Sequence, residues 1–447
     1  MVINAISRWY PTRFPEAPHK RRPLWRRADY PIVLPNGWPV PISRLWPLLS
    51  AAGAFTEEKD GDTVIALQGE TMRFEAEVGW GTIKIVVGPH DDLHKLKDAH
   101  EAAMALLVEA AGSLGAHVMG YGIQPMTIVH PGLITKRPVW QKMHEVLEMS
   151  WLTWALTCGD QLRVGLCQDE LVFLLNLANF YAPAVTALCA NSPIYRGTDG
   201  YHCSGRHLLM ATISGQHQRY GVFPTKFESI KDMITRFVKL PFFIQVDGED
   251  YAAHKGTFLE YIDASQAAGM DTGALVGAYL FHETSVWPAA KLHIDDGTMS
   301  MRGACQQPWE DHMAAVALNL GIIESGWELH DFFHTHIDPP VAPRVPYGVR
   351  QPPDPPRSAW DSWDKLHAYA DKPTTYGMQA REPFTGYLEG TLQICENALA
   401  ARGLGEEVYL APLWDRLRAE QSPAERIRRI FHRQGIGGML DALAVKP

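Results

Sequence analysis

Metal-ligand residue types gather most densely in the stretch HDFFHTHID near the middle of the C-terminal half. The candidates are His330, His334 and His336, with Asp331 and Asp338. A spacing of four residues puts His330 and His334 on one face of a helix, and imidazole and carboxylate groups are common zinc ligands. Apolar side chains alternate with them, which is equally typical of a helix end packed on a core. The sequence leaves both interpretations open.

The cysteines are the second group of reactive side chains. They are Cys158, Cys167, Cys189, Cys203, Cys305 and Cys395. None forms a CxxC pair, so free thiols in a reducing compartment are the simplest interpretation. A buried Cys305 would be inert, and it would become a nucleophile only if neighbouring Lys or Arg side chains lowered its pKa.

Two longer motifs carry more information than either group. They are ALCANSPIYRGTDGYHCSGR (residues 187–206) and FHETSVWPAAKLHIDDGTMSMRGACQQPW (residues 281–309). Both resemble signatures of plant-type glutamate–cysteine ligases and their bacterial carboxylate–amine ligase relatives. Shorter matches follow in the same order along the chain, namely GDTVIALQGE, GYGIQP, TCGDQ, QRYG and YLAPLWDRLRAEQSPAERI. The collinear set extends from about Leu24 almost to the end, and the set is more specific than any one piece.

The resemblance implies both a fold and a reaction. The implied fold is α+β and glutamine-synthetase-like, with a curved, mostly antiparallel sheet backed by helices. The implied reaction uses ATP to phosphorylate the γ-carboxylate of glutamate, after which an amine attacks the acyl phosphate to form an amide. Mg²⁺ ions would bridge the phosphates to a ring of carboxylates, because phosphoryl transfer needs its oxygen charge neutralised.

Several acids that the family uses are replaced in this sequence. Two glutamates on the family's first strand are matched by Arg26 and Ala28, and one on the last strand of its meander is matched by Lys84. The family's Glu-x-Arg-x-x-Asp motif reads Ser300 to Cys305 here, so that Arg302 stays and both acids are lost.

The replacements change the predicted charge of the site. Five acids in the family become Arg26, Ala28, Lys84, Ser300 and Cys305, which together carry two positive charges. A magnesium ion about 5 Å from one ammonium is repelled by roughly 6–7 kcal/mol at an effective dielectric constant of about 20. We therefore predict a site that disfavours the Mg²⁺ cluster and favours anions.

Other positions keep a residue that the resemblance places near substrate or nucleotide. These are Gln161, Asn191, Ser192, Ser204, Arg206, His282 and Arg302, while Lys291 replaces an arginine and Arg163 an asparagine. Arg206 and Arg302 are the candidate catalytic residues, because guanidinium binds carboxylate or phosphate bidentately. Lys84, Lys291 and Arg26 are candidate binding residues, and Glu77 and Glu75 are the remaining candidate metal ligands. The alternatives are that Arg302 forms a structural ion pair, that Lys84 is solvated, and that Ser300 and Cys305 simply pack.

Local patterns predict the elements that position these residues. Residues 63–87 read as a β-meander in which Ile83, Ile85 and Val87 share one face. Helical spacing predicts helices over 92–114 and 169–188, and a third begins at Pro308 and runs through Leu318. Ser422-Pro-Ala-Glu425 combines an N-cap and a capping box, and Gly435 is the predicted end of that helix.

The predicted organisation is an N-terminal arm over residues 1–24 and one ligase-like domain over residues 25–447. The arm is rich in Pro, Arg and Trp and is expected to wrap the body or a partner. Eight prolines between residues 339 and 356 exclude helix and central strand and predict a surface loop.

Composition limits the classes of partner. The formal net charge is −9, which argues against a general nucleic-acid binder. We see no uninterrupted apolar stretch that predicts a membrane span and no apolar signal core at the N-terminus, so a cytoplasmic location is expected. Expected partners are a small amino acid or acidic metabolite, and a ligase-like partner chain or a second copy.

Three functions remain open from the sequence. The first is a divergent ATP-dependent carboxylate–amine ligase that forms a γ-glutamyl type of amide. The second is a catalytically degenerate, ligase-like subunit that binds an acidic metabolite or nucleotide and supports an active partner. The third is metal-independent chemistry on the same scaffold.

Overall fold

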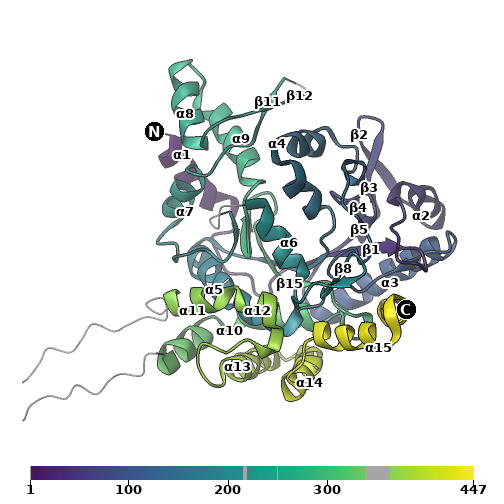
Figure 1. Ribbon diagram of the computed structural model, residues 1–447. Helices are drawn as coiled ribbons and strands as arrows, with labels where there is room; N and C mark the ends of the chain where they lie inside the picture. The colour runs from purple at the N-terminus through teal and green to yellow at the C-terminus, as the bar shows by residue number, and fades with distance from the viewer. Residues whose placement is uncertain (1, 215–218, 249, 338–362, 447) are drawn as a thin grey trace, which may run out of the picture.

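One antiparallel sheet forms the centre of the computed structural model, which describes residues 2–214, 219–248, 250–337 and 363–446. Its strands follow the order β14-β15-β7-β1-β5-β4-β3-β2, and the short β6 pairs with the end of β1. Figure 1 labels β15 and the strands β1 to β5 of this sheet. The strand bounds are Leu24–Val33 (β1), Thr56–Asp60 (β2), Thr63–Gln68 (β3), Met72–Ala76 (β4), Thr82–His90 (β5), His117–Val118 (β6), Gly159–Gly165 (β7), Ala290–His293 (β14) and Thr298–Cys305 (β15). The predicted α+β class with an antiparallel sheet is confirmed.

Three two-stranded sheets accompany the central one. They are formed by β8 and β9 (Ile194–Tyr195, Thr198–Asp199), by β10 and β13 (Tyr220–Gly221, Trp287–Pro288) and by β11 and β12 (Ile244–Asp247, Asp250–Ala253). The β10–β13 pair is parallel.

Helices cover one face of the central sheet and part of the other. Their bounds are Val2–Trp9 (α1), Trp46–Ala52 (α2), Leu93–Gly112 (α3), Pro138–Trp154 (α4), Leu171–Cys189 (α5), Gly205–Ser214 (α6), Ile230–Phe237 (α7), Phe258–Ala267 (α8), Thr272–Glu283 (α9), Ala314–Ile337 (α10), Trp363–Ala370 (α11), Lys372–Tyr376 (α12), Tyr387–Ala401 (α13), Ala411–Ala419 (α14) and Pro423–Leu443 (α15). Helices α3, α5 and α10 pack against β5, β15 and β7 on the apolar face. We call this the helix-covered face and the opposite one the polar face.

Helix α5 is the central element of the core. All of its residues except Val172 and Phe173 are buried. Among the described residues, the span Gln168–Cys189 is the one long and apolar enough to cross a bilayer, but its most apolar window is 89% buried inside the molecule. It is therefore explained as a core helix.

The strand faces follow from side-chain alternation. In β1 the residues Leu24, Ala28, Tyr30 and Ile32 are buried against the helices, which leaves the odd-numbered positions on the polar face. The predicted meander corresponds to β3, β4 and β5, and Ile83, Ile85 and Val87 are buried on one face as expected.

The predicted helices 92–114 and 169–188 are present, with Asp92 as the N-cap of α3. The third expected helix was wrong in its bounds. Only a short 3-10 turn follows Pro308, and α10 starts at Ala314 and continues well beyond Leu318, with a break in helical geometry at Gly326. The Ser422–Glu425 capping box begins α15 as predicted, and Gly435 interrupts this helix with a positive φ of 69° before it continues.

The N-terminal arm lies on the domain that follows it. Helix α1 contacts α7 and α9, and Val2, Ile6, Tyr10 and Phe14 belong to the main apolar core. The Tyr10 hydroxyl donates to the Glu283 carboxylate at 3.0 Å. The arm therefore wraps its own body. The proline-rich loop predicted at 339–356 lies outside the described residues.

Candidate functional site

Charged side chains from six adjacent strands line the polar face. Strand register places Glu75, Lys84 and Asp29 side by side across β4, β5 and β1. The row continues to Gly159 on β7, whose backbone N–H donates to Asp29 Oδ2 at 3.0 Å, and Gly159 is paired with Cys305 on β15. A second row places Arg163, Ser300 and Lys291 side by side across β7, β15 and β14.

Arg26 does not belong to this face, so its prediction as a binding residue was wrong. Its guanidinium is fully buried on the helix-covered face, where it contacts both carboxylate oxygens of Asp160 at 2.9 and 2.7 Å. It also donates to the His312 carbonyl at 2.8 Å. Ala28 is likewise buried in the core. The polar-face positions of β1 are Arg27 and Asp29, one residue further along.

Asp29 is therefore an acid of the polar face that the sequence comparison did not identify. The signal was present, because apolar Ala28, Tyr30 and Ile32 fix the even positions inward and the odd positions outward. With Arg27 and Asp29 in place of Arg26 and Ala28, the five substituted positions carry one net positive charge rather than two.

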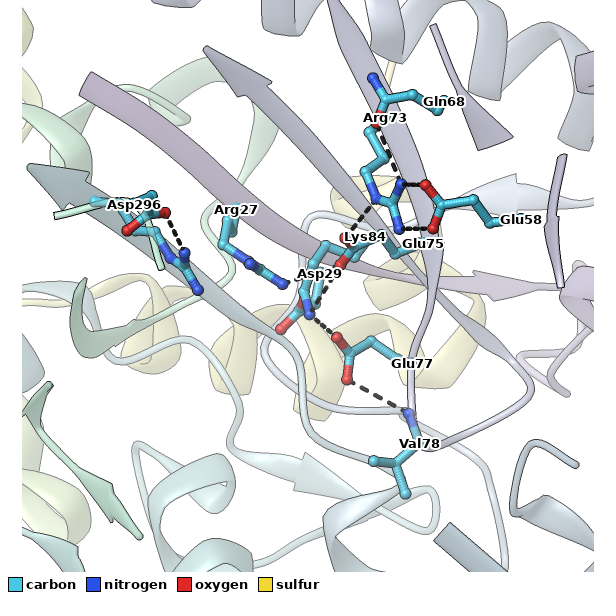
Figure 2. Close-up of polar contacts among 11 residues, drawn as sticks. Arg27, Asp29, Glu58, Gln68, Arg73, Glu75, Glu77, Val78, Lys84 and Asp296 are labelled. Carbon is cyan, nitrogen blue, oxygen red and sulfur yellow. Dashed lines mark hydrogen bonds and ion pairs between the residues drawn. The ribbon is translucent and has the colours of Figure 1, made fainter. Parts of the chain in front are cut away.

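Lys84 lies between three carboxylates, which we call the Lys84 cluster: Lys84 with Asp29, Glu75 and Glu77 (Figure 2). Lys84 Nζ contacts Glu77 directly and lies 3.8 Å from oxygens of both Asp29 and Glu75.

The pKa values of two acids in the Lys84 cluster are shifted in opposite directions. Burial, followed by repulsion from Glu77, raises the pKa of Asp29 to about 7 despite the attraction of Lys84. Burial also raises the pKa of Glu75, but the neighbouring cations outweigh it and hold this pKa at about 2. Those cations include Arg27 at 2.9 Å and Arg73 at 2.7 Å, and Arg73 also binds Glu58 (Figure 2).

Glu75 and Glu77, the candidate metal ligands, are thus bonded to protein cations. Across the described ranges, no three His, Cys, Asp or Glu side chains are arranged to hold a metal ion. The residues present do not fit a Mg²⁺ cluster, because an ammonium occupies the point on which the carboxylates converge.

A second group, which we call the cation cluster, consists of Arg163, Arg206, Lys291 and Arg302. Arg163 binds Asp296 at 2.7 Å. Lys291 donates to the backbone carbonyls of Glu283 and Val286, and Arg206 donates to the Arg302 carbonyl at 3.0 Å. Within the part of the chain that the structure describes, only Arg163 of these four has a carboxylate within ion-pair distance.

The crowding of positive charge is visible in the pKa shifts. Burial, followed by repulsion from Arg206, lowers the pKa of Arg302 to about 10. Burial lowers the pKa of Lys291 to about 8 against the attraction of Glu283. Burial and then Arg163 and Lys291 lower the pKa of His293 far below its usual value, and this ring is hydrogen-bonded to Ser300 Oγ at 2.9 Å.

Arg302 is the least satisfied member of the cation cluster. Its guanidinium has no hydrogen-bond or ion-pair partner among the described residues, and its Nε is inaccessible to solvent. It lines a cavity of about 230 Å³ between α5, α6 and α11–α12, which also includes His207, Tyr220 and Asp371. A partly buried guanidinium that lines a cavity without a protein acceptor favours an anionic ligand.

Arg206 reaches the sheet because Gly159 has no side chain. A Cβ on Gly159 would lie 2.6 Å from the Arg206 guanidinium. The Arg206 backbone N–H donates to Ser192 Oγ at 3.0 Å, which fixes the start of α6.

The other retained residues mainly support this arrangement. Asn191 donates to the backbone carbonyls of Gly120 and Gln306 at 2.9 and 2.8 Å. Ser204 Oγ lies 2.6 Å from His207 Nδ1 and 3.3 Å from the Cys305 thiol, which is buried. Gln161 lies on the polar face beside Arg27.

His282 was expected near the substrate, and that expectation was wrong. It lies on α9 between Phe242 and Phe258, and its Nε2 is hydrogen-bonded to the Phe237 carbonyl at 2.9 Å. Burial lowers its pKa to about 3, so it is a neutral core histidine.

The HDFFHTHID stretch lies at the end of α10, away from both clusters. His330 Nδ1 is 3.2 Å from Asp331, and His336 Nδ1 donates to the Phe332 carbonyl at 2.9 Å. The His334 side chain and Asp338 lie outside the described residues.

Solved structures define the class of this fold. A glutamate–cysteine ligase from Francisella tularensis, solved in complex with AMP, aligns over 96% of this chain and 88% of its own, with a TM-score of 0.55 and 10% sequence identity. At that identity the likeness concerns the fold alone, and it confirms the predicted glutamate–cysteine ligase type of architecture.

The chain belongs to glutamate-cysteine ligase family 2 (GCS2), whose family model matches residues 51–325. A Rhodococcus jostii protein, provisionally named glutamate–cysteine ligase 2-1, is 28% identical over 162 residues, which are 36% of this chain and 42% of that protein. The chloroplastic glutamate–cysteine ligase of Medicago truncatula is 20% identical over 391 residues, covering 83% of this chain and 70% of the plant protein. The chain thus matches less than half the length of the Rhodococcus relative.

Proposed function

We propose that the polar face binds a small anionic molecule, an acidic amino acid or a nucleotide phosphate, through guanidinium groups rather than through magnesium. The observation that carries this proposal is the partly buried Arg302 side chain, whose guanidinium lines a cavity and lacks an acceptor among the described residues. A partly desolvated guanidinium without a protein acceptor is stabilised when a ligand supplies the opposite charge.

The surrounding charges support an anion at this point. Arg206 lies beside Arg302, and repulsion between them contributes to the lowered pKa of Arg302. An anion between them would relieve that repulsion and would accept hydrogen bonds from both guanidinium groups. The cavity of about 230 Å³ has room for an amino acid or for the phosphate end of a nucleotide.

Calorimetry tests the proposal directly. Glutamate, ATP and AMP are titrated into the protein with excess Mg²⁺ and, separately, with EDTA. At least one ligand is expected to bind equally well in both conditions, and Arg302→Met should abolish that binding. Binding that requires Mg²⁺, or no binding of any of the three ligands, contradicts the proposal.

The second candidate is ATP-dependent ligation of a carboxylate to an amine, the reaction by which the family is named. Membership of the family favours it, and the Asp29, Glu75 and Glu77 carboxylates lie on the polar face. ATP would supply the phosphoryl group that activates the carboxylate, and the cation cluster would hold its phosphates.

Phosphate release separates the two candidates. The protein is incubated with ATP, Mg²⁺, glutamate and a panel of amines that includes cysteine. Release above the level of an Arg302→Met control supports ligation, and release under no pairing removes this candidate while leaving anion binding intact. Copurification of a second ligase-like chain would support a role as a subunit that assists an active partner. Dependence of anion binding on protein concentration would indicate a homodimer.

A further inference from the structure

Lys84 sits where oxygen donors from neighbouring strands converge. Register pairs it directly with Asp29 on β1 and Glu75 on β4, and Glu77 follows at the end of β4. The three carboxylates approach its ammonium from three directions (Figure 2). A single cation is therefore enclosed by three acids.

The enclosure is largely withdrawn from water. The Lys84 side chain is 12% exposed and the Asp29 side chain 9%. Asp29 Oδ1 is solvent-inaccessible and has no hydrogen-bond donor among the described residues, and it points at Lys84 Nζ from 3.8 Å. That distance is too long for a hydrogen bond, so the attraction between Asp29 Oδ1 and the Lys84 ammonium is electrostatic, and Arg206 adds a smaller attraction.

The three carboxylates are of the donor type found in divalent-cation sites, but an ammonium rather than a metal ion lies between them. Carboxylate oxygens are the preferred ligands of Mg²⁺ and Mn²⁺, and such ions need close, uncontested access to them. The positive charge of Lys84 is covalently attached to the chain, so it cannot leave the site. It repels any divalent ion that approaches.

We propose that the Lys84 ammonium is a tethered cation that takes the place of a divalent metal ion between Asp29, Glu75 and Glu77. The polar face keeps these carboxylates without needing a metal, and one substitution turns the cluster into a metal site. This inference is independent of anion binding at Arg302, since the two use different residues.

Substitution of Lys84 tests it. Lys84→Ala removes the ammonium, and Lys84→Glu also adds a fourth carboxylate. Binding of Mn²⁺ alone is measured by the loss of its free electron paramagnetic resonance signal, with Mg²⁺ as competitor. Each variant is expected to bind one Mn²⁺ per chain at least about tenfold more tightly than wild type, which corresponds to about 1.4 kcal/mol.

Two control variants test whether any added Mn²⁺ binding belongs to the Lys84 cluster. Lys59→Ala removes an exposed lysine from β2 of the same sheet, changes net charge equally, and should bind no additional Mn²⁺. Adding Glu77→Gln to Lys84→Ala removes one of the three carboxylates and should reverse the gain in Mn²⁺ affinity. If Lys84→Ala fails to fold, Lys84→Gln replaces it, because it keeps a polar side chain of moderate length without the charge.

The inference is overturned if wild type already binds Mn²⁺ at a site sensitive to Glu77→Gln. It is also overturned if Lys84→Glu and the neutral variant that folds bind no more Mn²⁺ than wild type. Calorimetry of anion binding in the same variants reports separately on the proposed function.

Discussion

Arg26 and Arg302 lie on opposite faces of the same sheet and differ in how their positive charge is satisfied. Arg26 has a bidentate carboxylate partner in Asp160 and a backbone carbonyl, so its charge is balanced within the protein. Arg302 lines a cavity and has no acceptor among the described residues. The first arrangement serves the fold, whereas the second is completed only by a ligand.

The Lys84 cluster is intermediate between these two cases. Its acids exceed its single ammonium, but Arg27 and Arg73 supply further positive charge on the Glu75 side. The polar face is thus nearly balanced at β4, β5 and β1, and it is positive at β7, β15 and β14. Ligand binding is expected at the positive end.

The largest effect is expected from breaking the Arg26–Asp160 pair. Arg26→Ala should lower the free energy of unfolding by about 3–5 kcal/mol, because it leaves the Asp160 carboxylate buried without its partner. Chemical denaturation measures the change. The double variant Arg26→Met with Asp160→Leu should recover much of the loss, and a single variant as stable as wild type would contradict the assignment of this pair to the fold.

Gly159→Ala should have the next largest effect. Its new Cβ would displace the buried Arg206 guanidinium and weaken the bond to the Arg302 carbonyl, at a cost of about 1–3 kcal/mol. Thermal or chemical unfolding measures the cost, and calorimetry should show weaker anion binding. Gly112→Ala is the matched control, since no atom lies within 4 Å of its added Cβ. If wild type and Gly159→Ala bind the anion equally well, the Arg206 guanidinium is not part of the anion-binding site.

A smaller, pH-dependent effect is expected at Asp29. Its folded-state pKa of about 7 lies above the value of an unfolded aspartate, so the folded state binds the extra proton between about pH 4 and 7. Stability from this group is therefore greatest below pH 4 and falls as pH rises to 7. Asp29→Asn keeps the side chain neutral and should gain at least about 1 kcal/mol relative to wild type between pH 4 and 8. Denaturation across this range measures the gain, and a constant difference between the two proteins would contradict the raised pKa.

The fold could be predicted well from the sequence because local patterns fix it. The meander, α3, α5 and the cap of α15 each follow from side-chain periodicity or capping residues. The bounds of α10 could not be obtained in this way. A proline favours a helix start at Pro308, whereas the chain first forms a 3-10 turn whose His312 carbonyl receives the Arg26 guanidinium.

The site was predicted less completely, for a physical reason. A shift of one residue in a strand exchanges its two faces, so matching Arg26 instead of Arg27 moved a core residue into the predicted site. The partners of Lys84 come from β1 and from the end of β4, and no single motif records that Asp29, Glu75 and Glu77 converge on it. His282 matched a motif position, but its surroundings on α9 are formed by residues from two other segments.

The smallest change in stability and the sharpest contrast with Arg26 are expected from Arg302→Met. Removing a partly exposed charge that has no protein acceptor costs little, so the free energy of unfolding should change by less than about 1 kcal/mol and can rise. Ligand binding should nevertheless be lost in calorimetry with EDTA present, whereas Arg302→Lys should retain part of it because the charge remains without the bidentate geometry. A loss of stability as large as that of Arg26→Ala would show that both arginines serve the fold, and the distinction between the two faces would fail.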